Sequence, residues 1–238
     1  MRKFYQLAVN QETREADVTI FGDITSWEWL ESDVSSYTLS KELGGLDVDV
    51  INVHINSYGG EVAEGLAIYN VLKQHKAKVK TYCDGFACSA ASVVFMAGDE
   101  RIMSAASLLM IHNAWTYTQG NASELRKAAD DLDTITGASV AAYMACVNID
   151  KDRVVELMDA ESWIAPPDAL EMGFATSVVG DGAKAPSQSA RKIVFDRLTS
   201  QVSPAPKAPP AQPKPKEKNL STFLNALCAK KGDQHEKS

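Results

Sequence analysis

The stretch G-F-A-C-S-A-A-S-V-V-F-M-A-G, residues 85–98, decides the predicted fold of this chain. It follows a strand-like run, residues 79–83, and continues as a short apolar segment rich in Ala and Ser. Ser89 is therefore expected where a strand gives way to a helix. Small neighbours let a substrate backbone approach, and the first turn of a helix offers unpaired N–H groups to a developing oxyanion. Ser89 is a candidate nucleophile, although a small-residue helix packed tightly on a neighbour would give the same pattern.

Strands and helices alternate on both sides of this stretch. Residues 48–56 and 78–83 have strand character, and residues 61–75 between them have apolar positions at helical spacing. The unit repeats, because a further strand, residues 107–112, follows the helix after Ser89. A strand, a helix and a parallel strand form the usual crossover unit, so the sequence predicts an α/β fold with a parallel sheet.

The other elements are shorter or less distinct. A capping box, Asn121 with Glu124, predicts a long helix from residue 121 to 145, whose mixed faces also suit a solvated helix. The remaining expected elements are a strand and turn at 16–24, a helix at 35–43 stopped by Gly44 and Gly45, a strand-like segment at 114–120, a helix at 150–158, a strand at 162–165, a helix at 167–172 and a closing segment at 174–179.

Charge is divided unevenly along the 238 residues. Residues 181–238 hold 11 of the 24 Lys and Arg and 5 of the 31 Asp and Glu, which leaves 13 basic and 26 acidic residues in 1–180. An acidic body argues against nucleic acid as a ligand, since phosphate backbones require a basic face.

The composition also predicts the domain organisation. Seven of the nine prolines lie beyond Gly180, and residues 203–218 form a Pro/Ala/Lys tract that cannot pack a core. We expect one domain at 1–180, a disordered linker at 181–218 and a short piece at 219–238. Apolar residues at helical spacing in the last piece suggest a docking element or a frayed end.

Several classes of protein and site are not expected. No run of residues has the length of a membrane span, and the N-terminus lacks the pattern of a signal peptide, so the sequence predicts a cytoplasmic protein. The four cysteines show no metal-ligand spacing, and neither a disulfide framework nor a metal or other cofactor is expected. Cys88 remains an alternative nucleophile to its neighbour Ser89 on residue type alone.

Four motifs occur in an order that resembles the Clp-type serine peptidase family, in particular its bacteriophage branch of head maturation (prohead) proteases. They are I-N-S-Y-G-G (55–60), G-F-A-C-S-A (85–90), M-I-H-N (110–113) and E-S-W-I-A-P-P-D-A-L-E-M-G-F-A (161–175). The resemblance covers residues 16–180. It implies a spiral of β-β-α units with a parallel sheet and a protruding handle helix.

The resemblance also implies the site residues. The family places the first glycine of its pair 30 residues before the nucleophile, as Gly59 stands before Ser89, and this spacing selects Ser89 over Cys88 and Ser92. The N–H groups of Gly60 and Ala90 would form the oxyanion hole. His112, in the M-I-H position, would be the general base, and the alternative is a histidine that merely caps a strand.

The third member of the implied triad has two candidates. Glu161 stands where the family usually has Asp, and a carboxylate there would stabilise the imidazolium of His112. Asp159 lies two residues earlier, on the same face if the segment is extended. We rank Glu161 first.

The resemblance finally implies partners. Residues 114–120 would line a cleft where a peptide adds as a strand, and the helix at 121–145 would join two rings of a homo-oligomer. The predicted function is an ATP-independent endopeptidase that cuts phage scaffold and capsid proteins inside the immature head, in the host cytoplasm. Alternatives are a degradative chamber served by a AAA+ unfoldase, a crotonase-type acyl-CoA enzyme, which needs no Ser89, and a catalytically dead structural ring.

Overall fold

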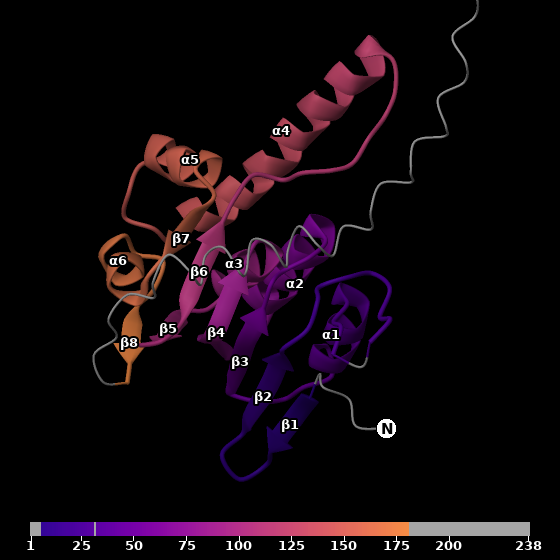
Figure 1. Ribbon diagram of the computed structural model, residues 1–238. Helices are drawn as coiled ribbons and strands as arrows, with labels where there is room; N and C mark the ends of the chain where they lie inside the picture. Colours follow the sequence, from indigo (N-terminus) through magenta and orange to yellow (C-terminus); the bar gives the residue numbers. More distant parts are fainter. Residues whose placement is uncertain (1–5, 31, 181–238) are drawn as a thin grey trace, which may run out of the picture. The chain divides into compact units, whose positions relative to one another are not determined.

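The computed structural model describes residues 6–30 and 32–180, which form one sheet with helices against it (Figure 1). The strands are β1 (Gln6–Asn10), β2 (Glu15–Ile20), β3 (Val50–Ser57), β4 (Lys78–Cys88), β5 (Glu100–Ser104), β6 (Leu108–Ile111), β7 (Ser162–Ile164) and β8 (Ser177–Val179). The helices are α1 (Ser36–Leu43), α2 (Val62–Gln74), α3 (Ala90–Phe95), α4 (Ala122–Met144), α5 (Lys151–Asp159) and α6 (Pro166–Glu171). The predicted linker and terminal piece, 181–218 and 219–238, lie outside the described residues.

The sheet confirms the predicted α/β class. Its strand order is β1-β2-β3-β4-β5-β8, and β2 through β8 on this path pair in parallel. Two antiparallel pairings make the sheet mixed rather than purely parallel, because β1 pairs with β2 and β7 pairs with β6. Strand β6 pairs with the end of β4. The first half of β4 therefore pairs with β5 and its last residues pair with β6.

Two sequence expectations near the site were wrong. The strand expected at 78–83 does not end there, because β4 continues to Cys88 and its second half pairs with β6. Residues 114–120 do not form a strand, and among the described residues the backbone of this segment pairs with no strand. Strands β1 and β5 were not predicted.

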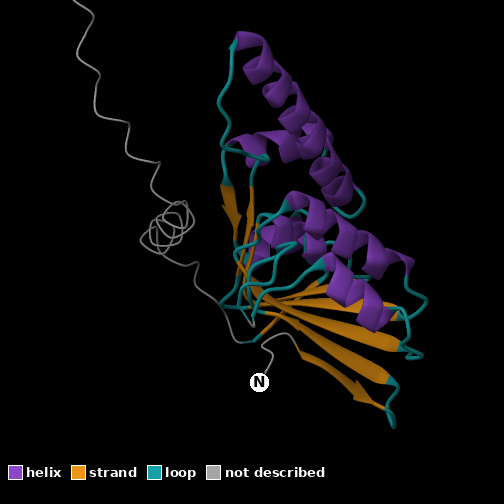
Figure 2. Ribbon diagram, turned by 90° about the vertical axis from the view of Figure 1, so that its right-hand side faces the viewer, coloured by secondary structure: helices purple, strands orange, loops and turns teal. Residues whose placement is uncertain are grey.

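The helices lie on one side of the sheet, and the opposite face has no helical cover in the part of the chain that is described (Figure 2). The uncovered face is polar. Asp17 lies opposite Asn52 across β2 and β3 and accepts its side-chain hydrogen bond, while His54 stacks on Tyr82 of β4 at 4.6 Å between ring centroids. A polar outer face and an apolar inner face follow from the two-residue period of the strands.

The core lies between the sheet and the helices. Ile51 and Ile55 of β3, Ile68 of α2 and Phe95 of α3 are completely buried. Burying a side chain of this size contributes about 1.5–3 kcal/mol. Helices α2 and α3 approach closely because Gly65 has no side chain. A Cβ at this position would stand 2.9 Å from the Cβ of Ala90.

Helix α4 projects from the body, and the segment before it, residues 113–120, runs outward beside the helix to its far end (Figures 1 and 2). The predicted capping box is present, since the side chain of Asn121 accepts from the N–H groups of Ser123 and Glu124 and the Glu124 carboxylate accepts from the Asn121 N–H. The N–H of Ala114 donates to the hydroxyl of Thr136 and ties the segment to the helix. No helix within residues 6–30 and 32–180 has the length and apolar character needed to cross a membrane.

Candidate active site

Ser89 stands at the junction between β4 and α3. Its backbone has φ 53° and ψ −126°, a conformation that costs a non-glycine residue about 1–3 kcal/mol. The Ser89 N–H donates to the carbonyl of Met110 in β6 at 2.9 Å, and this bond holds the junction against the sheet. A strained turn between strand and helix presents a serine hydroxyl at the end of the sheet, as a nucleophile requires.

His112 directly follows β6, which lies parallel to the end of β4. Because Cys88 of β4 is paired with Met110 of β6, the residues just beyond both strands meet at the same edge of the sheet. Nε2 of His112 lies 2.7 Å from Oγ of Ser89. Burial lowers the pKa of His112 below its ordinary value, and the charge of Glu161 opposes this shift. A neutral imidazole can accept the serine proton at neutral pH.

The first of the two glycines after β3, Gly59, lies directly against Ser89. A Cβ at Gly59, where φ is +97°, would meet the carbonyl oxygen of Cys88 at 2.5 Å, Cβ of Ser89 at 2.8 Å and the nitrogen of Ala90 at 2.9 Å. Only glycine allows this approach without strain. The turn is fixed by Ser57, whose hydroxyl donates to Gly22 and accepts from the N–H of Gly59.

Two backbone N–H groups beside Ser89 have no hydrogen-bond acceptor among the described residues. Ala90 is the first residue of α3, so its N–H has no partner inside the helix. The Gly60 N–H also has no acceptor in the described chain. The backbone hydrogen bonds to Ile24 are made by the carbonyl of Gly59 and the N–H of Glu61. Both N–H groups are therefore free to donate: that of Ala90 directly follows Ser89, and that of Gly60 follows the glycine that contacts Ser89.

Glu161 and Asp159 occupy different positions relative to His112. Strands β6 and β7 pair antiparallel, with Ile111 opposite Ser162 as the last pair, so His112 and Glu161 each lie one residue beyond the paired strands. Asp159 ends helix α5, so the segment is not extended as the same-face argument assumed, and its carboxylate accepts from Nδ2 of Asn113 at 2.7 Å. Neither carboxylate hydrogen bonds to His112 within the described chain.

Cys88, the alternative nucleophile, is completely buried, and burial raises the pKa of its thiol far above the ordinary value. Burial likewise raises the pKa of Cys83 to about 12. Since the thiolate is the nucleophilic form, these two cysteines are unsuited to attack a substrate.

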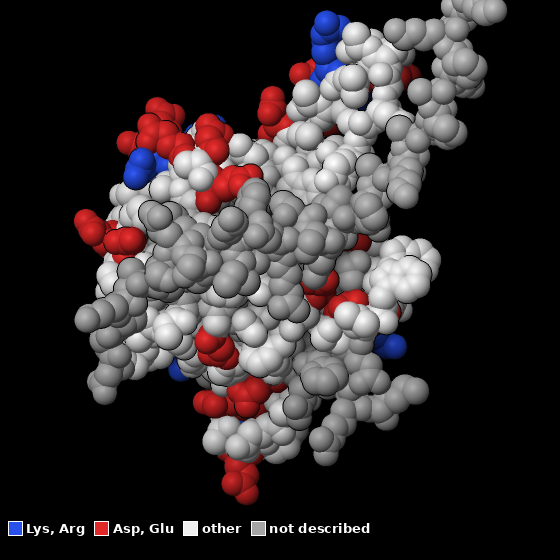
Figure 3. Space-filling view, in the orientation of Figure 1, with Lys and Arg blue, Asp and Glu red and all other residues white. Residues whose placement is uncertain are grey.

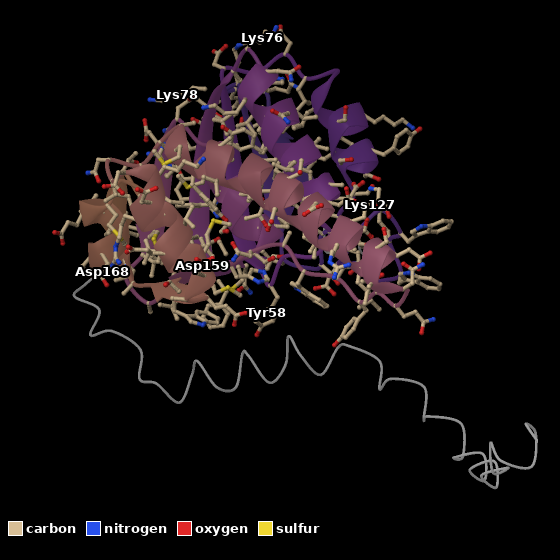
Figure 4. All side chains as sticks on the ribbon, turned by 90° about the horizontal axis from the view of Figure 1, so that it is seen from above. Tyr58, Lys76, Lys78, Lys127, Asp159 and Asp168 are labelled. Atoms are coloured by element: carbon tan, nitrogen blue, oxygen red, sulfur yellow. The ribbon has the colours of Figure 1, made fainter. Side chains whose placement is uncertain are left out.

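A set of aromatic side chains lies beside the site. Phe86 of β4 contacts Tyr58 at 5.9 Å and Trp163 of β7 at 5.8 Å between ring centroids. Seen from above, Tyr58 lies on the opposite side of the domain from Lys76 and Lys78 near the start of β4 (Figure 4). Trp163 and Asn113 lie in two of the quoted motifs. The sequence alone gives them no role in the site, because neither side chain can exchange a proton near neutral pH.

The described residues contain no group of three or more His, Cys, Asp or Glu side chains that could hold a metal ion. Acidic side chains are spread over the described part of the face shown in Figure 3, which has no broad basic patch. The chemistry that this arrangement supports is attack by an activated hydroxyl on a carbonyl carbon.

Comparison with known proteins gives one consistent result. A family model described as Clp protease matches residues 40–182. A protein named ATP-dependent Clp protease proteolytic subunit from Deinococcus radiodurans is 33% identical over 131 residues, which are 54% of this chain and 64% of that protein, less than two thirds of its length. A protein of the same name from Bacteroides thetaiotaomicron is 33% identical over 153 residues, 62% of this chain and 70% of that protein.

A solved structure shares the fold. A point mutant of ClpP1 from Listeria monocytogenes superposes with a TM-score of 0.61 at 22% identity, covering 71% of this chain and 93% of that one.

Proposed function

Because this chain belongs to the Clp protease family, we propose that it is a serine-type endopeptidase with Ser89 as nucleophile and His112 as general base. The observation that carries the proposal is the 2.7 Å contact between Nε2 of His112 and Oγ of Ser89 at a strained strand-to-helix turn. A crotonase-type enzyme has no need of this contact.

The proposed reaction is acyl transfer in two halves. Oγ of Ser89 attacks the carbonyl carbon of a peptide bond while its proton passes to Nε2 of His112. The carbonyl oxygen takes the negative charge and accepts hydrogen bonds from the N–H groups of Gly60 and Ala90. The imidazolium then gives the proton to the leaving amine. Water repeats the sequence on the acyl-enzyme and restores the Ser89 hydroxyl.

Glu161 is the proposed acid of the triad. Its charge raises the pKa of His112 against the effect of burial, so it favours the imidazolium that forms during attack. Asp159 is engaged by Asn113 and is the alternative.

We further propose that the substrates are phage scaffold and capsid proteins, cut without ATP during head maturation in the host cytoplasm or the immature virion. The support is the E-S-W form of the fourth motif, residues 161–163, and the Pro/Lys-rich segment after residue 180, which suits a tether to an assembling shell. The printed names of the relatives favour a second candidate, a degradative subunit that works with a separate ATPase. Cleavage of purified capsid protein by the chain alone, without any ATPase, separates the two.

A homo-oligomer is also proposed. Leu125 and Ile135 of α4 and Trp115 and Tyr117 of the adjoining segment are exposed apolar side chains, and contact between copies would bury them. Sedimentation analysis of a variant with Leu125→Glu and Ile135→Glu should show a smaller species than the native chain. An unchanged sedimentation coefficient would remove α4 from the interface.

The direct test of the activity is intact-mass spectrometry after treatment with a fluorophosphonate, followed by peptide mapping. One adduct on Ser89 is expected, and Ser89→Ala should abolish it while leaving the fold intact. Cys88→Ala is the matched control and should still be labelled. A folded native chain that forms no adduct would refute the proposed peptidase and favour the acyl-CoA or purely structural alternatives.

A further inference from the structure

A buried chain of hydroxyl groups connects the long helix α4 to the backbone of Ser89. Oγ of Ser92 donates to the carbonyl oxygen of Ser89 at 2.6 Å and lies 2.8 Å from the hydroxyl of Tyr143. A hydroxyl has one proton, and a carbonyl oxygen can only accept. The Ser92 hydroxyl therefore donates its hydrogen bond to the Ser89 carbonyl, and the Tyr143 hydroxyl donates to Oγ of Ser92.

Both side chains are shut away from water. Ser92 and Tyr143 are each 1% exposed, and the Tyr143 ring packs edge-on against Phe174. Burial raises the pKa of Tyr143 above its ordinary value, so the phenol keeps its proton at neutral pH and can donate. A hydrogen bond in such a dry site is strong, and leaving either partner without the other is costly.

The carbonyl that receives this bond belongs to the peptide unit that carries the Ala90 N–H. Because a trans peptide is planar, its C=O and N–H point in opposite directions, and fixing the oxygen fixes the direction of the N–H. The same oxygen also accepts from the N–H groups of Ser92 at 2.9 Å and Val93 at 3.4 Å. The Ser89 backbone needs such restraint because its conformation is strained.

We propose that Ser92 and Tyr143 are positioning residues, which hold the Ser89–Ala90 peptide with its carbonyl turned into the core and its N–H turned toward the oxyanion. The proposal rests on the proposed function and extends it. Tyr143 acts through Ser92, and neither side chain touches the substrate.

The test compares the variants Tyr143→Phe and Ser92→Ala with the matched control Thr81→Val. Oγ1 of Thr81, also completely buried, donates at 2.7 Å to the carbonyl of Phe95 at the other end of α3. Each of the three substitutions deletes a buried hydroxyl that supports α3. Only Tyr143→Phe and Ser92→Ala affect the hydrogen bonds that hold the Ser89–Ala90 peptide. The Tyr143→Phe change removes a single oxygen atom and is the least disruptive.

The probe is a fluorophosphonate, which forms a bond from Ser89 Oγ to phosphorus as fluoride leaves and the serine proton passes to His112. Its maximal rate constant, kinact, and its apparent affinity, KI, are measured against pH together with the melting temperature. Loss of an entire oxyanion donor costs about 10²–10³-fold, so loosening one should lower kinact about tenfold, with KI within about twofold. The apparent pKa of the pH profile should not move. Thr81→Val should lower the melting temperature yet keep kinact within about twofold.

A double variant completes the experiment. If Tyr143 acts through Ser92, adding Tyr143→Phe to Ser92→Ala should lower kinact no further than Ser92→Ala alone. The inference is overturned if Tyr143→Phe and Ser92→Ala label as fast as Thr81→Val, or if the two effects multiply. A native chain that takes no label at Ser89 refutes the proposed function itself, whereas a labelled native chain with equally fast variants refutes only this inference.

Discussion

Replacing Gly59 by Ala tests how closely the glycine turn is fitted to the nucleophile. The added Cβ would stand 2.5 Å from the carbonyl oxygen of Cys88, 2.8 Å from Cβ of Ser89 and 2.9 Å from the nitrogen of Ala90. Two of these three atoms belong to the backbone, so no side-chain rotation relieves the overlap. Either the turn or the start of α3 must move.

The size of the movement follows from the contact. A carbon atom and a carbonyl oxygen approach to about 3.3 Å at closest, so the 2.5 Å contact requires a displacement of about 0.8 Å. Misplacing reacting groups by about 1 Å costs about 10²-fold in rate. The φ of +97° adds about 1–3 kcal/mol of strain for any residue with a Cβ. We therefore expect labelling of Ser89 to slow about 100-fold in a protein that is destabilised but folded.

The assay is the rate of fluorophosphonate labelling, measured beside thermal unfolding. Gly137→Ala in α4 is the control, because a Cβ there meets nothing within 4 Å. Ala is preferred to Gly inside a helix by about 1 kcal/mol, so this variant should be slightly more stable and equally reactive. If Gly59→Ala labels within threefold of the native rate, the turn is not fitted to Ser89 as the structure describes it.

Three further predictions concern charge. The rate of labelling should rise with pH through an apparent pKa below 6.5, because burial lowers the pKa of His112. The free energy of unfolding should rise over the same range, because the unfolded chain binds the proton of His112 more readily than the folded chain. Acidification should reverse both effects. Glu161→Gln should lower that apparent pKa and slow labelling about tenfold, which is less than the ~10⁴-fold loss expected for a triad acid that is hydrogen bonded to the base. Asp159→Asn should change the rate of labelling less than about twofold. Asp84→Asn should lower the pKa of His54, followed by NMR, because the 2.8 Å hydrogen bond to Asp84 is the main cause of its raised pKa.

The elements that the sequence predicted are those with strong local signals. Asn121 with Glu124 predicted the start of α4, and the apolar spacing over 61–75 predicted α2, because capping and helical period act within a few residues. The position of Ser89 before α3 followed from the change from a strand-like run to small residues. Such signals depend little on the rest of the fold.

The expectations that failed depended on distant partners. The strand expected to end at residue 83 continues through Asp84 and Gly85 in β4, where the Asn56 side chain accepts from the N–H of Phe86 and would stand 2.5 Å from a Cβ at Gly85. Residues 114–120 resemble a strand but pair with none in the described chain, and α4 holds Ala114 instead. Tertiary hydrogen bonds override propensity at both places.

The identity of the triad acid is a question of register rather than of residue type. Both candidates are carboxylates, Asp159 at the end of α5 and Glu161 between α5 and β7. The extended segment assumed from the sequence would have put Asp159 and Glu161 on one face, but α5 continues to Asp159 and Glu161 turns the chain with φ 47°. That turn leads into the antiparallel pairing of β7 with β6, whose last pair is Ile111 with Ser162, so Glu161 and His112 each lie one residue beyond the paired strands. The Glu161 carboxylate is near enough to His112 for its charge to oppose the effect of burial on the pKa of the imidazole. We therefore keep Glu161 as the proposed acid, while the Asp159 carboxylate accepts a hydrogen bond from Asn113, the residue after His112.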